Sequence, residues 1–262
     1  MKRLRIPTIV SLLAVCFLGT GCGSAMLSDE HLAKKAKGQF AQMKKSERLS
    51  NNASQKVMIN RIGRRITGVA QIDLPGTEWE FVLFDKKEPN AFAMPGGKVG
   101  VNSGLITLAR GNEDEVAAVI GHEVAHVAFR HSNKRMSQAI GIGLGGVILD
   151  TAMRNKSNTD RILARGAYGA GTALGLALPF SRSQEREADH RGLYYAAMAG
   201  YDPRASVSFW KKMQKAGGGK VPEFLSTHPD SGKRIEFLES HMDHAMALYR
   251  EAKQARGEKP NP

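Results

Sequence analysis

Residues 122–126 read His-Glu-Val-Ala-His, the composition of a zinc site with a general base beside it. On a helix, residues four apart lie on one face, with Cβ atoms about 5–6 Å apart. His122 and His126 could therefore bind one metal ion through ring nitrogens at about 2.0–2.1 Å. Glu123 would then lie beside the open coordination position, where it could accept a proton from a water activated by the metal. The string predicts metal-assisted hydrolysis.

The surrounding sequence indicates a helix that would hold these side chains rigidly. Asn112 is a suitable N-cap, acidic residues 113–115 fill the first turn, and basic residues such as Arg130 and His131 lie near the expected C-terminal end. Because the string also arises by chance, two ordinary, partly buried histidines are the alternative.

A catalytic zinc site needs a third protein ligand and one open position. Glu185 and Asp189 are four residues apart on what the sequence indicates is a second helix. One of them could bind the metal while the other supports a ligand histidine from behind. Glu187 points elsewhere and is expected to be solvated or ion-paired. Taken alone, this stretch could also be a charged, exposed helix with no metal role.

The metzincin arrangement is excluded, because HExxHxxGxxH requires glycine and histidine where this chain has Phe129 and Ser132. His131 is thus not the third ligand by that template, and we interpret the ligand set as His, His, Glu, the gluzincin type.

Four segments of the chain resemble the zinc metalloprotease family that includes the CAAX prenyl protease, HtpX, BepA and LoiP. They are Asn90–Ile106, Glu115–His126, Ser181–Asp189 and Ser226–Pro229. The resemblance implies an α+β, mainly helical, zincin-like domain with a small β-sheet beside the active-site helix. It also implies one Zn²⁺ per chain.

The resemblance also implies roles for individual residues. Glu185 is expected to be the third metal ligand and Asp189 to support a ligand. His228, in the His-Pro motif, is expected to lie near the metal as an autoinhibitory or transition-state group, and Arg182 falls on a family arginine near the active site. Without the resemblance, a histidine before proline in a turn is more often a surface residue.

The segment between two apolar runs is a candidate for substrate binding. Residues 79–84 and 98–102 have the composition of strands and are separated by a Pro-Gly-Gly turn. A sheet edge beside a zinc helix can hold an extended peptide by backbone pairing. We therefore expect Asn90, Ala91, Phe92 and Ala93 to bind substrate; a plain hairpin that only buries core is the alternative.

The first 21 residues have the pattern of a lipoprotein signal peptide. A basic segment, Met1–Arg5, precedes the apolar segment Ile6–Leu18 and small residues before Cys22. The apolar segment is shorter than the roughly 20 residues of a membrane span. An acylated Cys22 would anchor the chain, and Gly23 after it favours, by resemblance to Gram-negative lipoproteins, the outer membrane facing the periplasm.

We expect a lipid-anchored tether and first helix over residues 22–48, a zinc metallopeptidase domain over 49–253 and a disordered tail over 254–262. Residues 139–179 include two glycine- and alanine-rich apolar stretches. They predict a close-packed helical pair or a lid over the cleft, with membrane contact as the lesser alternative.

The composition limits the partners. Lysine and arginine number 38 against 25 aspartate and glutamate, giving a net charge of +13. No nucleic-acid-binding motif accompanies this charge, so we predict no nucleic acid partner and favour contact with anionic lipid. The only cysteine besides Cys22 is Cys16, inside the predicted signal peptide, which leaves no disulfide and no thiolate metal site in a processed chain.

Together these patterns predict a zinc endopeptidase of the bacterial cell envelope that cleaves unfolded or misassembled envelope proteins. The main alternative is a latent or non-proteolytic outer-membrane assembly factor, or chaperone, that keeps the zinc fold. A lipoprotein that only binds anionic ligands would require the HExxH string to be coincidental.

Overall fold

The computed structural model describes residues 28–166, 180–216, 223–228 and 232–261. The helices are α2 (Asp29–Ser46), α3 (Ala53–Ala70), α4 (Ser103–Leu108), α5 (Glu113–Ala128), α6 (His131–Ala152), α8 (Arg182–Met198), α9 (Arg204–Ala216), α10 (Glu223–Thr227), α11 (Arg234–Ser240) and α12 (Met242–Ala255). The strands are β1 (Glu80–Phe84), β2 (Ala91–Met94) and β3 (Lys98–Asn102). The predicted signal peptide and Cys22 lie outside the described residues.

The three strands form one small sheet in the order β1-β3-β2. β3 is central and fully buried; it pairs in parallel with β1, where Val82 lies opposite Gly100, and antiparallel with β2, where Phe92 lies opposite Gly100. The turn from β2 to β3 contains Gly96 and Gly97, both with φ near +75°, a conformation that favours glycine. The hairpin is thus β2–β3, and the expected substrate segment is itself a strand at the edge of the sheet.

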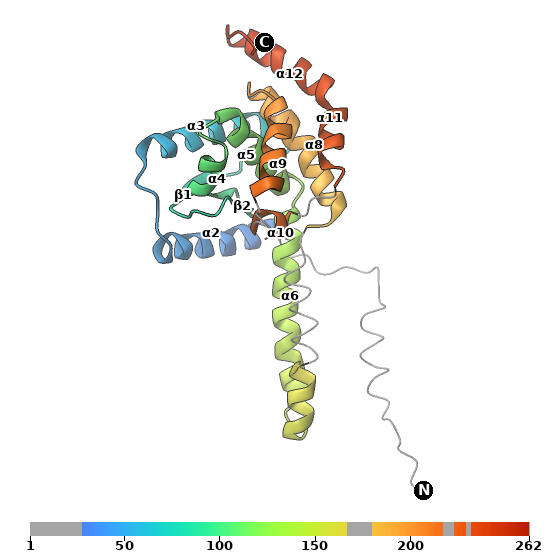
Figure 1. Ribbon diagram of the computed structural model, residues 1–262. Helices are drawn as coiled ribbons and strands as arrows, with labels where there is room; N and C mark the ends of the chain where they lie inside the picture. Colours follow the sequence, from blue (N-terminus) through green and yellow to red (C-terminus); the bar gives the residue numbers. More distant parts are fainter. Residues whose placement is uncertain (1–27, 167–179, 217–222, 229–231, 262) are drawn as a thin grey trace.

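Helix α5 is the centre of the domain and carries the HExxH string (Figure 1). Its expected N-cap is confirmed, since the Asn112 side chain accepts hydrogen bonds from the backbone N–H groups of Asp114 and Glu115. α5 is buried on nearly all sides, packed against α8, α3, α9 and strand β2. A helix in this position must be apolar all round apart from its functional side chains, as its valine- and alanine-rich sequence is.

Helices α5 and α8 approach closely at a pair of glycines. A Cβ atom added to Gly192 would lie 2.7 Å from backbone atoms of His122, and one added to Gly121 would lie 2.7 Å from the carbonyl oxygen of Gly192. Neither distance is compatible with a side chain. The two glycines therefore let the helix with the histidine pair lie directly against the helix with Glu185 and Asp189.

The end of α5 differs from the sequence-based expectation. The helix ends at Ala128, and Arg130 adopts a left-handed conformation with φ 58° before α6 begins at His131. Of the basic residues expected at the end of the helix, Arg130 lies between α5 and α6, and His131 is the first residue of α6. The change of chain direction at Arg130 places His131 in the interior of the domain, where its ring contacts His126.

Helix α6 extends away from the body of the domain (Figure 1). Residues 158–166 are also helical, and Arg165 forms an ion pair with Asp150 of α6 at 2.7 Å. The second apolar stretch of the expected helical pair falls almost entirely on residues 167–179, which lie outside the described residues, so the pair stays a prediction. None of the helices within the described ranges has a stretch long and apolar enough to cross a membrane.

The end of the chain is held against the domain, unlike the disordered tail expected from residue 254. α12 continues to Ala255, Lys253 forms an ion pair with Glu258 at 2.8 Å, and the Asn261 N–H donates to the hydroxyl of the buried Tyr249. The helical periodicity and these polar contacts together fix residues 254–261.

Candidate metal centre and active site

Four buried side chains bring metal-binding atoms to one point. His122 and His126 come from α5, Glu185 from α8 and His228 from the residue after α10, and their ligand atoms all lie within 4.8 Å of one another. The two Nε2 atoms of the HExxH histidines are 3.0 Å apart. Glu185 Oε1 lies 3.3 Å from His126 Nε2 and 3.0 Å from His228 Nδ1. Ligand atoms about 2.0–2.1 Å from a tetrahedral metal lie roughly 3.3 Å from one another.

The hydrogen bonds around the two HExxH histidines show that this donor set fits a cation. His122 Nδ1 lies 2.9 Å from the Asp189 carboxylate, and His126 Nδ1 lies 3.0 Å from His131. A neutral imidazole carries one N–H, so donation from each Nδ1 leaves a lone pair on each Nε2. Two lone pairs facing each other at 3.0 Å repel unless a positive ion lies between them. The residues present therefore suit zinc.

The electrostatics keep these histidines neutral, as metal ligation requires. Burial lowers the pKa of His122 well below its usual range, and the positive charge of Arg234 lowers it further. Burial likewise lowers the pKa of His126 well below its usual range. Burial acts to raise the pKa of Glu185, but the contacts with His126 and His228 act in the opposite direction and outweigh it, so the pKa is lowered and the group stays a carboxylate.

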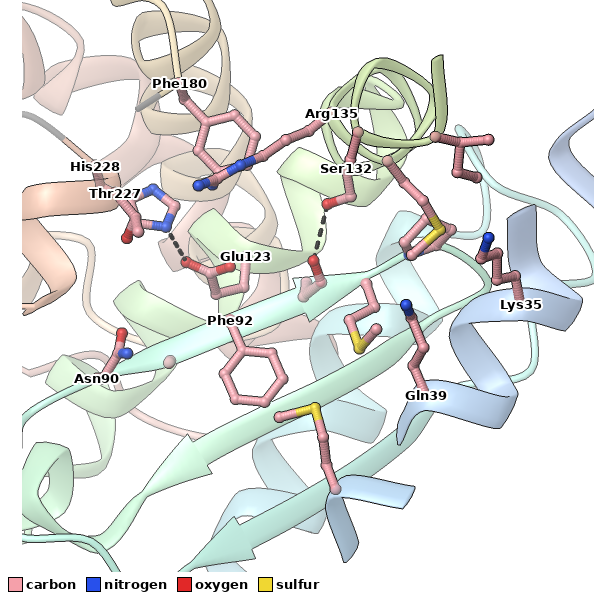
Figure 2. A pocket seen from close by; sticks show the side chains of 18 of the residues that line it. Lys35, Gln39, Asn90, Phe92, Glu123, Ser132, Arg135, Phe180, Thr227 and His228 are labelled. Atoms are coloured by element: carbon pink, nitrogen blue, oxygen red, sulfur yellow. Dashed lines mark hydrogen bonds and ion pairs between the residues drawn. The ribbon is translucent and has the colours of Figure 1, made fainter. Parts of the chain in front are cut away.

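Glu123 lies beside the donor group without belonging to it. Its Oε1 is 3.5 Å from His228 Nε2, the contact drawn in Figure 2, and the backbone of Ala93 donates to its carboxylate. Burial raises the pKa of Glu123 well above its usual range, and the nearby Glu185 carboxylate adds to the effect. A carboxyl group with a raised pKa can take up and release a proton near neutral pH.

The structure separates the two carboxylates that the sequence left as alternatives. Glu185 points into the donor group, whereas Asp189 lies behind His122 and pairs with Arg234. Burial raises the pKa of Asp189 to about 6, although Arg234 acts in the opposite direction. This arrangement matches the positions that the resemblance implied for Glu185 and Asp189.

Arg234 is the residue of this site that the sequence did not reveal. It is the first residue of α11, its side chain is 2% exposed, and its Nη2 lies 2.6 Å from Asp189 and 2.9 Å from Glu185. Its guanidinium also lies over the ring of Trp210, 3.5 Å from the centroid. Arg234 lies six residues after His228, at the start of the next helix. This short spacing is a signal that could have indicated its place in the site.

Arg182, which the resemblance placed near the active site, lies about one turn before Glu185 on α8. It is the exposed first residue of α8, and within the described residues it makes none of the contacts of the buried donor group. At the start of a helix its side chain can extend into solvent. Arg234 is the buried arginine of the site.

A cleft of about 840 Å³ opens onto Glu123 and His228 (Figure 2). It is lined on one side by the expected substrate segment, Asn90 to Ala93, and on the others by residues of α2 and α6. The Asn102 N–H donates to the carbonyl of Asn90, so these two residues form a hydrogen-bonded pair of the β2–β3 ladder. Hydrogen-bonded and non-hydrogen-bonded pairs alternate in an antiparallel ladder, and the backbone N–H and C=O groups of Ala91 and Ala93 therefore point away from β3. The Ala93 carbonyl accepts from the Ser132 hydroxyl at 2.8 Å. This side of β2 faces the cleft, and both backbone groups of Ala93 on it have partners, Glu123 and Ser132.

Two buried histidines of α5, a glutamate of α8 and a sheet edge over the cleft define a zincin-type metallopeptidase domain. The profile of peptidase family M48 matches residues 53–242, and the chain belongs to this family.

Curated relatives include two mitochondrial metalloendopeptidases named OMA1 and a bacterial protease. The chain is 37% identical over 185 residues to the OMA1 of Arabidopsis thaliana, covering 70% of this chain and 36% of that protein. It is 34% identical over 189 residues to the OMA1 of Schizosaccharomyces pombe, covering 71% and 53%. It is 31% identical over 230 residues to the beta-barrel assembly-enhancing protease of Yersinia pestis, covering 83% and 45%. The chain thus spans about half or less of the length of these relatives.

Because Arg234 is buried and Arg182 is exposed, we expect their substitution to change the free energy of unfolding by very different amounts. Arg234→Gln should lower the free energy of unfolding at pH 8 by about 3 kcal/mol, because it leaves buried Asp189 without its charged partner. The deficit should shrink on acidification, as Asp189 takes up a proton. Arg182→Gln, at an exposed position, is the matched control and should change the free energy by less than about 0.5 kcal/mol. Urea unfolding of both variants measures this, and equal effects would contradict the assignment of Arg234 to the site.

Proposed function

We propose that this chain is a zinc endopeptidase of the bacterial cell envelope that cleaves unfolded or misassembled envelope proteins. The observation that carries the proposal is the convergence of His122, His126 and Glu185 on one point, with Glu123 beside it at the floor of a cleft. The relatives that are named metalloendopeptidases and a beta-barrel assembly-enhancing protease support it.

The protein's own groups fit peptide hydrolysis. The edge strand β2 lines the cleft and would pair with an extended substrate, which suits a protease that accepts many sequences. Zinc, when bound by His122, His126 and Glu185, would supply Lewis-acid polarisation of the scissile carbonyl and lower the pKa of water. Glu123 would accept the proton of the attacking water and return it to the leaving amine.

His228 supports a latent resting state. Its Nδ1 lies 3.2 Å from His122 Nε2 and 3.0 Å from Glu185, so it takes the fourth place of the donor group. A substrate carbonyl needs that place, and His228 would have to leave it before cleavage. The same observation favours the second candidate function, a non-proteolytic assembly factor in which His228 stays in place.

Cleavage of casein by the purified chain and two variants tests the activity. Glu123→Gln should keep about one zinc per chain and lose cleavage by about 10²–10⁴-fold, because it removes the group that moves the proton. His228→Ala should also keep zinc and cleave faster than the wild type, and His31→Ala, an exposed histidine, serves as the matched control.

The double variant Glu123→Gln/His228→Ala should be as inactive as the first. If the His228→Ala variant binds zinc but does not cleave casein, the result would support the assembly factor. If the chain binds no zinc, the proposed activity would be refuted.

The proposed location rests on the signal-peptide pattern that ends at Cys22. Wild-type chain expressed in a Gram-negative bacterium should sediment with the outer membrane, and Cys22→Ser should be released from it because the acyl chains that anchor the protein are lost. Sucrose-gradient fractionation with immunoblotting measures this. An unchanged membrane fraction in Cys22→Ser would contradict the lipid anchor.

A further inference from the structure

A second group of contacts lies behind His126, on the side away from the donor group. His131 is fully buried, with its Nδ1 3.0 Å from the Nδ1 of His126 and its Nε2 3.0 Å from Oε2 of Glu187. The chemistry described above uses neither His131 nor Glu187. Glu187 is therefore in hydrogen-bond contact with a histidine that touches a metal ligand.

The backbone places these two residues for this contact. The left-handed Arg130 ends α5 and lets α6 begin at His131, so that the ring returns against α5. Glu187 follows Glu185 by two residues on α8, so the helix directs one carboxylate into the donor group and the other toward the start of α6. Side chains two residues apart on a helix do not face the same way.

The order of protons along this chain of contacts is determined. His126 offers the lone pair of Nε2 to the metal only if its single N–H is at Nδ1. That N–H can then donate only to an unprotonated His131 Nδ1, which places the N–H of His131 at Nε2, opposite the Glu187 carboxylate. The reverse order would put a proton on His126 Nε2, where it would face His122 and block the metal.

We propose that His131 and Glu187 are positioning residues that hold His126 in its metal-binding tautomer. The proposal rests on the proposed zinc chemistry. Each HExxH histidine then has its own supporting carboxylate, His122 by direct contact with Asp189 and His126 through the ring of His131.

The two supports differ in their surroundings. Asp189 is 3% exposed at its side chain, whereas Glu187 is 50% exposed. Water therefore competes for the Glu187 carboxylate and weakens its hold on His131. Partners that orient a ligand change metal affinity by about 10–100-fold when removed. The loss of Glu187 should lie at the lower end of this range, and the loss of the His131 nitrogens should lie higher.

The experiment measures zinc affinity by competition with a chromophoric chelator, using the full chain in detergent. Glu187→Ala should weaken zinc binding by about 10-fold, and Glu187→Gln should weaken it less because the amide oxygen can still accept the His131 N–H. His131→Phe keeps a ring of similar shape without the nitrogens and should weaken binding by up to about 100-fold. Glu239→Gln is the matched control, since Glu239 is 53% exposed and pairs with Lys211.

Urea unfolding of the metal-free proteins separates positioning from structural support. The exposed Glu187 should leave the metal-free unfolding midpoint unchanged while the zinc affinity falls. Affinities of Glu187→Ala and His131→Phe within twofold of the wild type would overturn the proposal, as would a Glu187→Ala variant whose metal-free form loses stability in parallel with affinity. A wild type without measurable zinc binding would instead refute the proposed zinc chemistry on which it rests.

Discussion

The structure depends on a buried group of nitrogen and oxygen atoms that all present lone pairs, so they cannot form hydrogen bonds with one another. The Nε2 atoms of His122 and His126 and the nearest carboxylate oxygens of Glu185 lie 3.0–3.6 Å from one another inside the domain. Lone pairs and negative charge at this spacing are unfavourable away from water. A divalent cation turns the same arrangement into a stable site, which explains why so many polar atoms lie in the core of a small domain.

The rest of the fold holds this group in place. Gly121 and Gly192 let α5 and α8 lie in contact, so that ligands from two helices reach one point. The buried guanidinium of Arg234 balances the carboxylates of Asp189 and Glu185 from the far side. The sheet contributes from the remaining side, because the backbone of the edge strand β2 contacts Glu123 at Ala93. Positioning and substrate access thus come from separate elements.

The sequence was most informative where spacing along one helix determines geometry. The four-residue spacings of His122 with His126 and of Glu185 with Asp189 place these side chains correctly, and the Asn112 cap locates the start of α5. Contacts between distant segments were not readable, so Arg234 was missed. Local propensity also failed at Arg130, whose left-handed conformation depends on tertiary packing rather than on residue type, and in the sheet, where the parallel pairing of β1 with β3 was not expected.

The most direct test of the central claim is zinc K-edge X-ray absorption on the purified full chain. The account predicts about one zinc per chain with about four nitrogen and oxygen ligands at roughly 2.0–2.1 Å, three of them imidazoles in the latent state and two in His228→Ala. Zinc bound with sulfur ligands, or with the imidazole number unchanged in His126→Ala, would contradict the claim that His122, His126 and Glu185 form the site.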